Sequence, residues 1–142
     1  MTPSEAIAVL LDADSDTTDA RGDRYFGTTQ PVPEGTTLPF QVCSEIDTEF
    51  HHYFTGNGGV ALRTLQLDHF AETEADAVTL ANAARNALDA YRGTVTASGA
   101  ADLTISTLRI QDEASEPSTP DAGRASGISR IRQEYSMVFL LT

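Results

Sequence analysis

The stretch that most constrains the fold begins at Leu65, where a β-strand pattern runs within a few residues into a helix start. Leu65, Leu67 and His69 alternate with other positions, so they would lie on one face of a strand. Thr73 then stands where a helix N-cap is expected, and Asp76 three residues later takes the place that completes a capping box. A strand that leads so directly into a helix predicts a helix packed back on a sheet.

Hydrophobic periodicity predicts the remaining elements. Helical spacing of apolar residues predicts a short helix from Pro3 that ends between Asp12 and Asp14, and a longer one from Glu74 to about Arg92. Apolar alternation predicts strands at 38–46, 60–70, 103–110 and 128–141. Two polar segments rich in turn-forming residues, 15–37 and 111–127, are typical of long loops. The order α-β-β-α-β-β predicts one α+β domain, 1–142, with a single four-stranded, mostly antiparallel sheet and helices packed on it.

The charge of the chain limits its partners. Its 142 residues include 21 acidic and 9 basic side chains, a net charge of −12, and every basic residue is an arginine. Such acidity argues against nucleic-acid binding, because contact with phosphates needs clustered cationic side chains. Two explanations of the acidity remain open. The protein comes from a salt-rich source, which the absence of lysine favours, or its acidic residues line a channel through which DNA passes without binding. No apolar run is long enough for a membrane span, and no signal peptide is expected.

Residues capable of chemistry are present but scattered. Cys43 is the only cysteine and lies in an apolar run, which predicts a buried thiol. The three histidines lack the convergent partners of a zinc site. The alternating aspartates 12, 14 and 16 imitate a calcium loop, but Thr17 stands where the sharp turn needs glycine. We therefore expect no catalytic residues, no metal and no cofactor, and predict that the chain is not an enzyme.

Candidate interface residues come from the last predicted strand and the two predicted loops. Arg130 and Arg132 alternate on the polar face of that strand, and Arg124 lies just before it. Arginine is well suited to ion pairs between subunits, so these side chains either stay solvated or pair with acidic groups of a neighbouring copy. The other candidates are an aromatic residue in the first loop and acidic residues in the second: Tyr25, Glu113, Glu116 and Asp121.

Several short motifs occur in an order that resembles the tail-completion or tail-terminator proteins of tailed viruses, from bacteriophages or haloarchaeal viruses. The matching pieces are Gly22-Asp23-Arg24-Tyr25-Phe26-Gly27, Leu38-Pro39-Phe40-Gln41-Val42, Leu65-Gln66-Leu67-Asp68, the alanine-rich stretch from Ala75 to Leu88, and Gln133-Glu134-Tyr135-Ser136-Met137-Val138-Phe139. His69 departs from the family pattern, in which an apolar residue is usual at that place. The resemblance extends over about residues 4–142.

The resemblance implies a structural role. Proteins of this family form a ring, usually of six copies, on the end of the tail tube, where they stop its polymerisation and offer a joining surface to the head or neck. The implied partners are the chain itself, the tail tube protein and a head-tail connector or neck protein, with genomic DNA passing through the lumen without specific binding. The implied location is the virion tail or neck, after assembly in the host cytoplasm. Two alternatives remain: another connector or stopper protein of the neck, and, from a different class, a small-molecule-binding α+β domain or enzyme.

Overall fold

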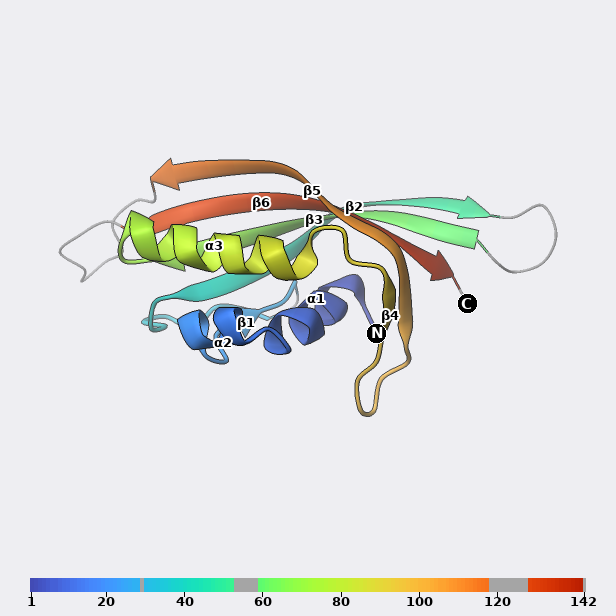
Figure 1. Ribbon diagram of the computed structural model, residues 1–142, viewed down its shortest axis with the longest axis horizontal. Helices are drawn as coiled ribbons and strands as arrows, with labels where there is room; N and C mark the ends of the chain where they lie inside the picture. Colours follow the sequence, from blue (N-terminus) through green and yellow to red (C-terminus); the bar gives the residue numbers. More distant parts are fainter. Residues whose placement is uncertain (29, 53–58, 118–127, 142) are drawn as a thin grey trace.

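The computed structural model describes residues 1–28, 30–52, 59–117 and 128–141 (Figure 1). Its helices are α1 (Pro3–Asp12), α2 (Ser15–Arg21) and α3 (Glu74–Leu88). Its strands are β1 (Tyr25–Phe26), β2 (Phe40–His52), β3 (Gly59–Ala71), β4 (Gly93–Val95), β5 (Leu103–Pro117) and β6 (Ser129–Leu141). All three helices lie on one side of the sheet, which curls around α1 (Figure 1).

The prediction of a four-stranded, mostly antiparallel sheet was wrong. One six-stranded mixed sheet runs in the order β1-β2-β3-β6-β5-β4. β1 is parallel to β2, whereas the other neighbours are antiparallel. The two missed strands, β1 and β4, have 2 and 3 residues and stand at the two edges. Segments this short have no readable alternation, because their conformation is fixed by pairing with a longer neighbour.

The predicted loop at 15–37 contains α2 and β1, so this prediction was also wrong in part. Asp14 caps α2, since its side chain accepts hydrogen bonds from the Thr17 backbone N–H at 3.0 Å and from Thr17 Oγ1 at 2.6 Å. The helix has no apolar stripe, and its buried side chains are Thr17 and Arg21. A hydrophobic pattern therefore could not reveal it. Two of the three aspartates that resemble a calcium loop thus have other roles: Asp14 caps α2, and Asp12 forms an ion pair with Arg21.

The predicted loop at 111–127 was wrong over its first part, since β5 continues to Pro117. This part of β5 is polar, yet it pairs with β6 from Asp112↔Glu134 to Pro117↔Ser129. The pairing, rather than any apolar face, keeps it extended. The remainder of that segment, 118–127, lies outside the described residues.

The predicted N-cap of α3 is confirmed, whereas its predicted end near Arg92 was four residues too late. Thr73 Oγ1 accepts from the Asp76 backbone N–H at 3.2 Å. After Leu88 the backbone leaves the helix, because Asp89 is extended (ψ 132°) and Ala90 is left-handed (φ 66°), with the Ala90 N–H donating to the Leu108 carbonyl at 2.8 Å. Contact with β5 thus ends the helix before Gly93.

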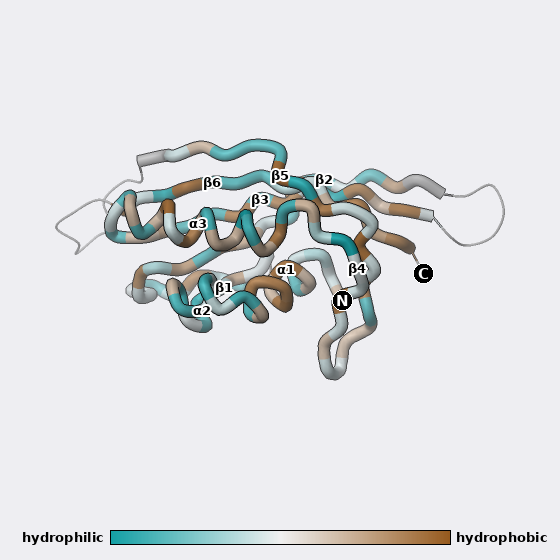
Figure 2. The backbone as a smooth tube through the Cα atoms, viewed as in Figure 1, coloured by the Kyte–Doolittle hydropathy of each residue, from teal (hydrophilic) through white to brown (hydrophobic). Residues whose placement is uncertain are grey.

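The core lies between the helices and the concave face of the sheet. Figure 2 shows hydrophobic positions concentrated in α1 and along the central strands. On β6 the buried positions alternate with half-buried ones, as expected for a strand with one covered face, and β3 follows the same pattern except near residue 63 and at Asp68, which is also buried. The main cluster consists of Ala6, Ile7, Leu11, Cys43, Ala61, Leu65, Leu67, Ala84, Leu88, Val95, Leu103, Ile105, Leu108, Tyr135, Met137 and Phe139. The predicted burial of Cys43 is confirmed, and burial raises the pKa of its thiol to about 11.

Candidate interaction surfaces

The arginines predicted on β6 lie on the convex face of the sheet, away from the helices. Arg130 Nε and Nη2 both donate to Asp68 Oδ1 at 3.1 Å, and the guanidinium lies 5.5 Å from the centroid of the Phe70 ring. Asp68 is only 5% exposed, so Arg130 compensates a nearly buried carboxylate within the same chain. Arg132 stands opposite Asp68 in the β3–β6 register. One of the three predicted intermolecular cations, Arg130, is therefore engaged in an internal pair.

The acidic candidates are divided between described and undescribed parts of the chain. Glu113 on β5 accepts from Gln133 Nε2 at 2.7 Å and pairs with Arg85 of α3 at 3.4 Å, so it joins strand to helix. Glu116 lies opposite Arg130 in the register of β5 and β6. Asp121 and Arg124 lie outside the described residues.

Tyr25 is an internal anchor of β1. Its hydroxyl donates to the Ser4 carbonyl of α1 at 2.9 Å, and the Arg21 guanidinium lies 5.5 Å from its ring centroid. Burial raises the pKa of the phenol far above its usual value. Tyr25 therefore ties β1 to α1 and forms one wall of a cavity.

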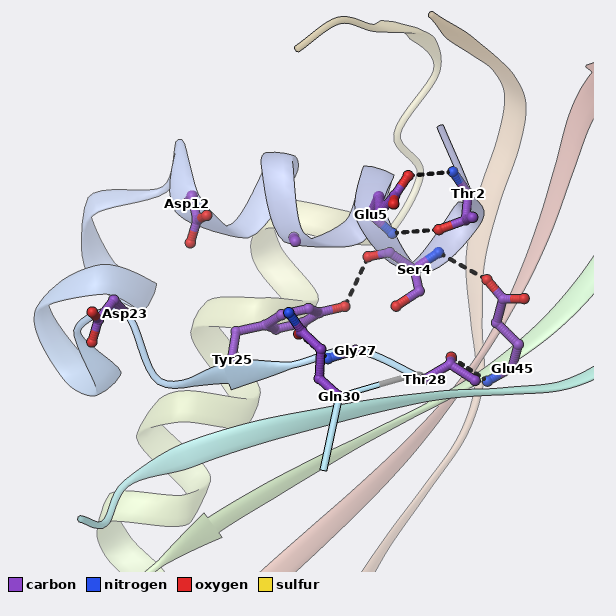
Figure 3. Close-up of a pocket in the computed structure, with 11 residues that line it drawn as sticks. Thr2, Ser4, Glu5, Asp12, Asp23, Tyr25, Gly27, Thr28, Gln30 and Glu45 are labelled. Carbon is purple, nitrogen blue, oxygen red and sulfur yellow. Dashed lines mark hydrogen bonds between the residues drawn. The ribbon is translucent and has the colours of Figure 1, made fainter. Parts of the chain in front are cut away.

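That cavity, of about 480 Å³, opens between α1 and the segment that runs from Asp23 to Gln30 (Figure 3). Its lining carries four carboxylates, from Glu5, Asp12, Asp23 and Glu45, and no arginine. We call this cavity the acidic pocket. Its volume falls within the range of about 300–1,000 Å³ typical of ligand sites.

Three of the four carboxylates have partners. Glu5 accepts from the Thr2 backbone N–H at 2.7 Å as part of the α1 capping box. Asp12 pairs with Arg21, and Glu45 accepts from the Ser4 N–H and pairs with Arg63. Within the described ranges, the Asp23 side chain makes no hydrogen bond or ion pair, and Asp23 is exposed. Asp23 thus offers a free acceptor at the mouth of the acidic pocket.

A buried polar network crosses the core between the central strands. His69 Nε2 donates to Gln133 Oε1 at 2.7 Å, while His69 Nδ1 accepts from Gln41 Nε2 at 3.1 Å. Tyr135 Oη donates to the same Gln133 oxygen at 2.8 Å, and Gln133 Nε2 donates to the Ala81 carbonyl of α3 at 3.0 Å. Burial lowers the pKa of His69 to about 4, so the imidazole is neutral at pH 7. The network joins β2, β3, β6 and α3, and it explains why a histidine is tolerated in the core.

Sequence reasoning missed the acidic pocket and the network. A signal for the network was present, since Gln41, His69 and Gln133 are polar residues at strand positions otherwise occupied by apolar ones. Nothing in the sequence signalled the pocket, because its walls come from α1, β1 and β2. Among the described residues, no cluster of potential metal ligands occurs, and no helix is long and apolar enough to span a membrane.

The fold resembles that of a chain in the solved structure titled "Virion of native gene transfer agent (GTA) particle". The TM-score is 0.66, the sequence identity is 15%, and the match covers 98% of this chain and 95% of that chain. At this identity the likeness concerns the fold. No family model matches the chain, and no curated protein matches it.

Proposed function

We propose that the chain is a virion structural protein that forms a ring on the end of a viral tail tube, ends tube polymerisation and provides the joining surface to the head or neck. The observation that carries this proposal is a fold shared over nearly the whole length of both chains with a protein of a gene transfer agent virion. The ordered motifs at 22–27, 38–42, 65–68 and 133–139 support the same role.

The physical properties of the chain suit such a role. Its partners would be other copies of itself, the tail tube protein and a connector protein, and its location the virion, after assembly in the host cytoplasm. DNA would pass through the lumen without specific binding, because the net charge of −12 repels phosphate. The proposal includes no enzymatic activity, since assembly of this kind works through surface complementarity alone.

The proposal is tested by polymerising the purified tail tube protein with and without this chain and imaging the products by electron microscopy. We expect a ring at one end of each tube and shorter tubes as the ratio of chain to tube protein rises. Tubes of unchanged length with bare ends would contradict the proposal. The same mixture with portal protein in place of tube protein tests the second candidate, a connector or stopper, which would bind the portal instead.

An alternative of a different class, a small-molecule-binding domain, is favoured only by the acidic pocket. Its size is adequate, but its exposed carboxylates suit a cationic group rather than an apolar ligand.

A further inference from the structure

Among the basic side chains that the structure describes, two arginines have no ion-pair or side-chain hydrogen-bond partner. Arg92 and Arg109 are exposed, and within the described part of the chain they make no ion pair or side-chain hydrogen bond. The other described arginines are engaged: Arg21 with Asp12, Arg24 with the Pro39 carbonyl, Arg63 with Glu45, Arg85 with Glu113, Arg130 with Asp68, and Arg132 in a further interaction. Two unpaired cations in so acidic a chain are available to another molecule.

Arg92 and Arg109 belong to the same edge of the sheet. Arg109 lies on β5, and Arg92 immediately precedes β4. The chain before Arg92 runs beside β5, because the Ala90 N–H donates to the Leu108 carbonyl and the Ile110 N–H donates to Asp89 Oδ1 at 3.1 Å. We call these two side chains the arginine pair.

The acidic pocket lies at the other end of the strand order, although the curl of the sheet brings β4 into contact with α1. Its walls are built on α1, β1 and the start of β2, whereas β5 and β4 close the opposite end of the strand order. A closed ring needs two different surfaces of one chain that fit each other, because each copy presents one surface to the copy before it and the other to the copy after it. The acidic pocket and the arginine pair are two such surfaces, of opposite charge.

We propose that in the ring the arginine pair of one copy enters the acidic pocket of the next, with Asp23 as the principal acceptor. This inference rests on the proposed function, since it names the contact that closes the ring. A guanidinium group donates two parallel hydrogen bonds to a carboxylate, so a free aspartate at the mouth of a cavity suits it. Among the described residues, Glu5, further along the cavity wall, accepts only from a backbone N–H and so adds negative charge around the incoming group, whereas the charge of Glu45 is compensated by Arg63.

The test uses charge reversal on each side of the contact. One variant carries Asp23→Arg, and a second carries Arg92→Asp with Arg109→Asp. A third carries all three changes. Glu34→Arg, at an exposed residue that does not line the pocket, is the control for the charge change of the first variant. Native mass is measured by sedimentation velocity over a concentration series, at low and at molar salt.

We expect each reversed variant to raise the apparent dissociation constant of the assembly by about tenfold or more, and Glu34→Arg to leave it unchanged. An equimolar mixture of the first and second variants should recover the wild-type mass, because alternating copies then meet only opposite charges. The triple variant should recover it as well, which also excludes a folding defect as the cause of the loss.

The two proposals fail in different ways. A wild-type multimer that none of these variants weakens would overturn the proposed contact and leave the ring intact. Weakening without recovery, in the mixture and in the triple variant alike, would also overturn it. A wild-type chain that stays monomeric at every concentration and both salts, and does not bind tail tubes, would overturn the ring itself.

Discussion

The two faces of the central sheet differ in whether helices cover them and in how deeply their side chains are buried. The concave face of β3 and β6 packs against the helices, and Leu65, Leu67, Tyr135 and Met137 are almost completely buried there. On the convex face the apolar side chains are half-buried, and Leu140 is 36% exposed. The concave face therefore supplies most of the folding energy, while no described helix covers the convex face.

The largest expected effect lies at the centre of the concave face. Tyr135→Ala should destabilise the fold by about 4 kcal/mol, because it opens a cavity in a dense core and removes the hydrogen bond to Gln133. Val138→Ala on the convex face, three residues away, is the matched control and should cost about 1 kcal/mol. Urea unfolding measures both. Equal losses of unfolding free energy in the two variants would contradict the difference between the two faces.

Acidification should act on the concave face through His69. The pKa of His69 is about 4 in the folded chain against 6.5 as the reference, so the unfolded chain binds the proton more readily. The contribution of neutral His69 to the unfolding free energy is therefore complete above pH 6.5. It decreases as the pH falls towards 4, where the loss reaches about 3 kcal/mol. His69→Gln removes this titration, so its unfolding free energy should fall less steeply than that of the wild type over the same interval. Parallel curves would show that His69 does not titrate in this way.

A smaller effect is expected where the convex face has its own buried charge. Arg130→Ala leaves the Asp68 carboxylate, whose side chain is 7% exposed, without its cation and should cost about 2 kcal/mol. Asp68→Asn with Arg130→Ala should recover part of that loss, because no uncompensated charge remains. A double-mutant cycle measured by chemical unfolding gives the coupling energy between Asp68 and Arg130. A coupling energy near zero would mean that water solvates Asp68 as well as Arg130 does.

The smallest effect on stability is expected at the apolar end of the convex face. Leu140→Ser should lower the unfolding free energy by about 1 kcal/mol, since the side chain is already partly solvated. If the convex face takes part in assembly, the same change should lower tube capping in the electron microscopy assay. Unchanged capping would restrict the assembly surfaces to the edges of the sheet.

Sequence periodicity predicted the long elements, because their signals are local. The strand from Leu65 and the Thr73 cap depend on residues a few positions apart, and both are confirmed. The edge strands β1 and β4, and the polar half of β5, depend on pairing with distant residues, which periodicity does not report.

The candidate site was predictable to a smaller extent for the same reason. The sequence placed Arg130 on a polar face, but its pairing with Asp68 depends on the β3–β6 register. The acidic pocket brings together Glu5, Asp23 and Glu45, which lie far apart in the chain. Arg92 and Arg109 were overlooked, because an unpaired arginine is recognised only when the partners of the other arginines are known.

The most direct test of the ring is the native mass of the purified wild-type chain, measured by light scattering at low and at molar salt. We predict a closed multimer, near six copies, whose mass no longer rises with concentration once the ring is complete. A chain that remains monomeric at both salts and leaves tail tubes uncapped would contradict the central claim.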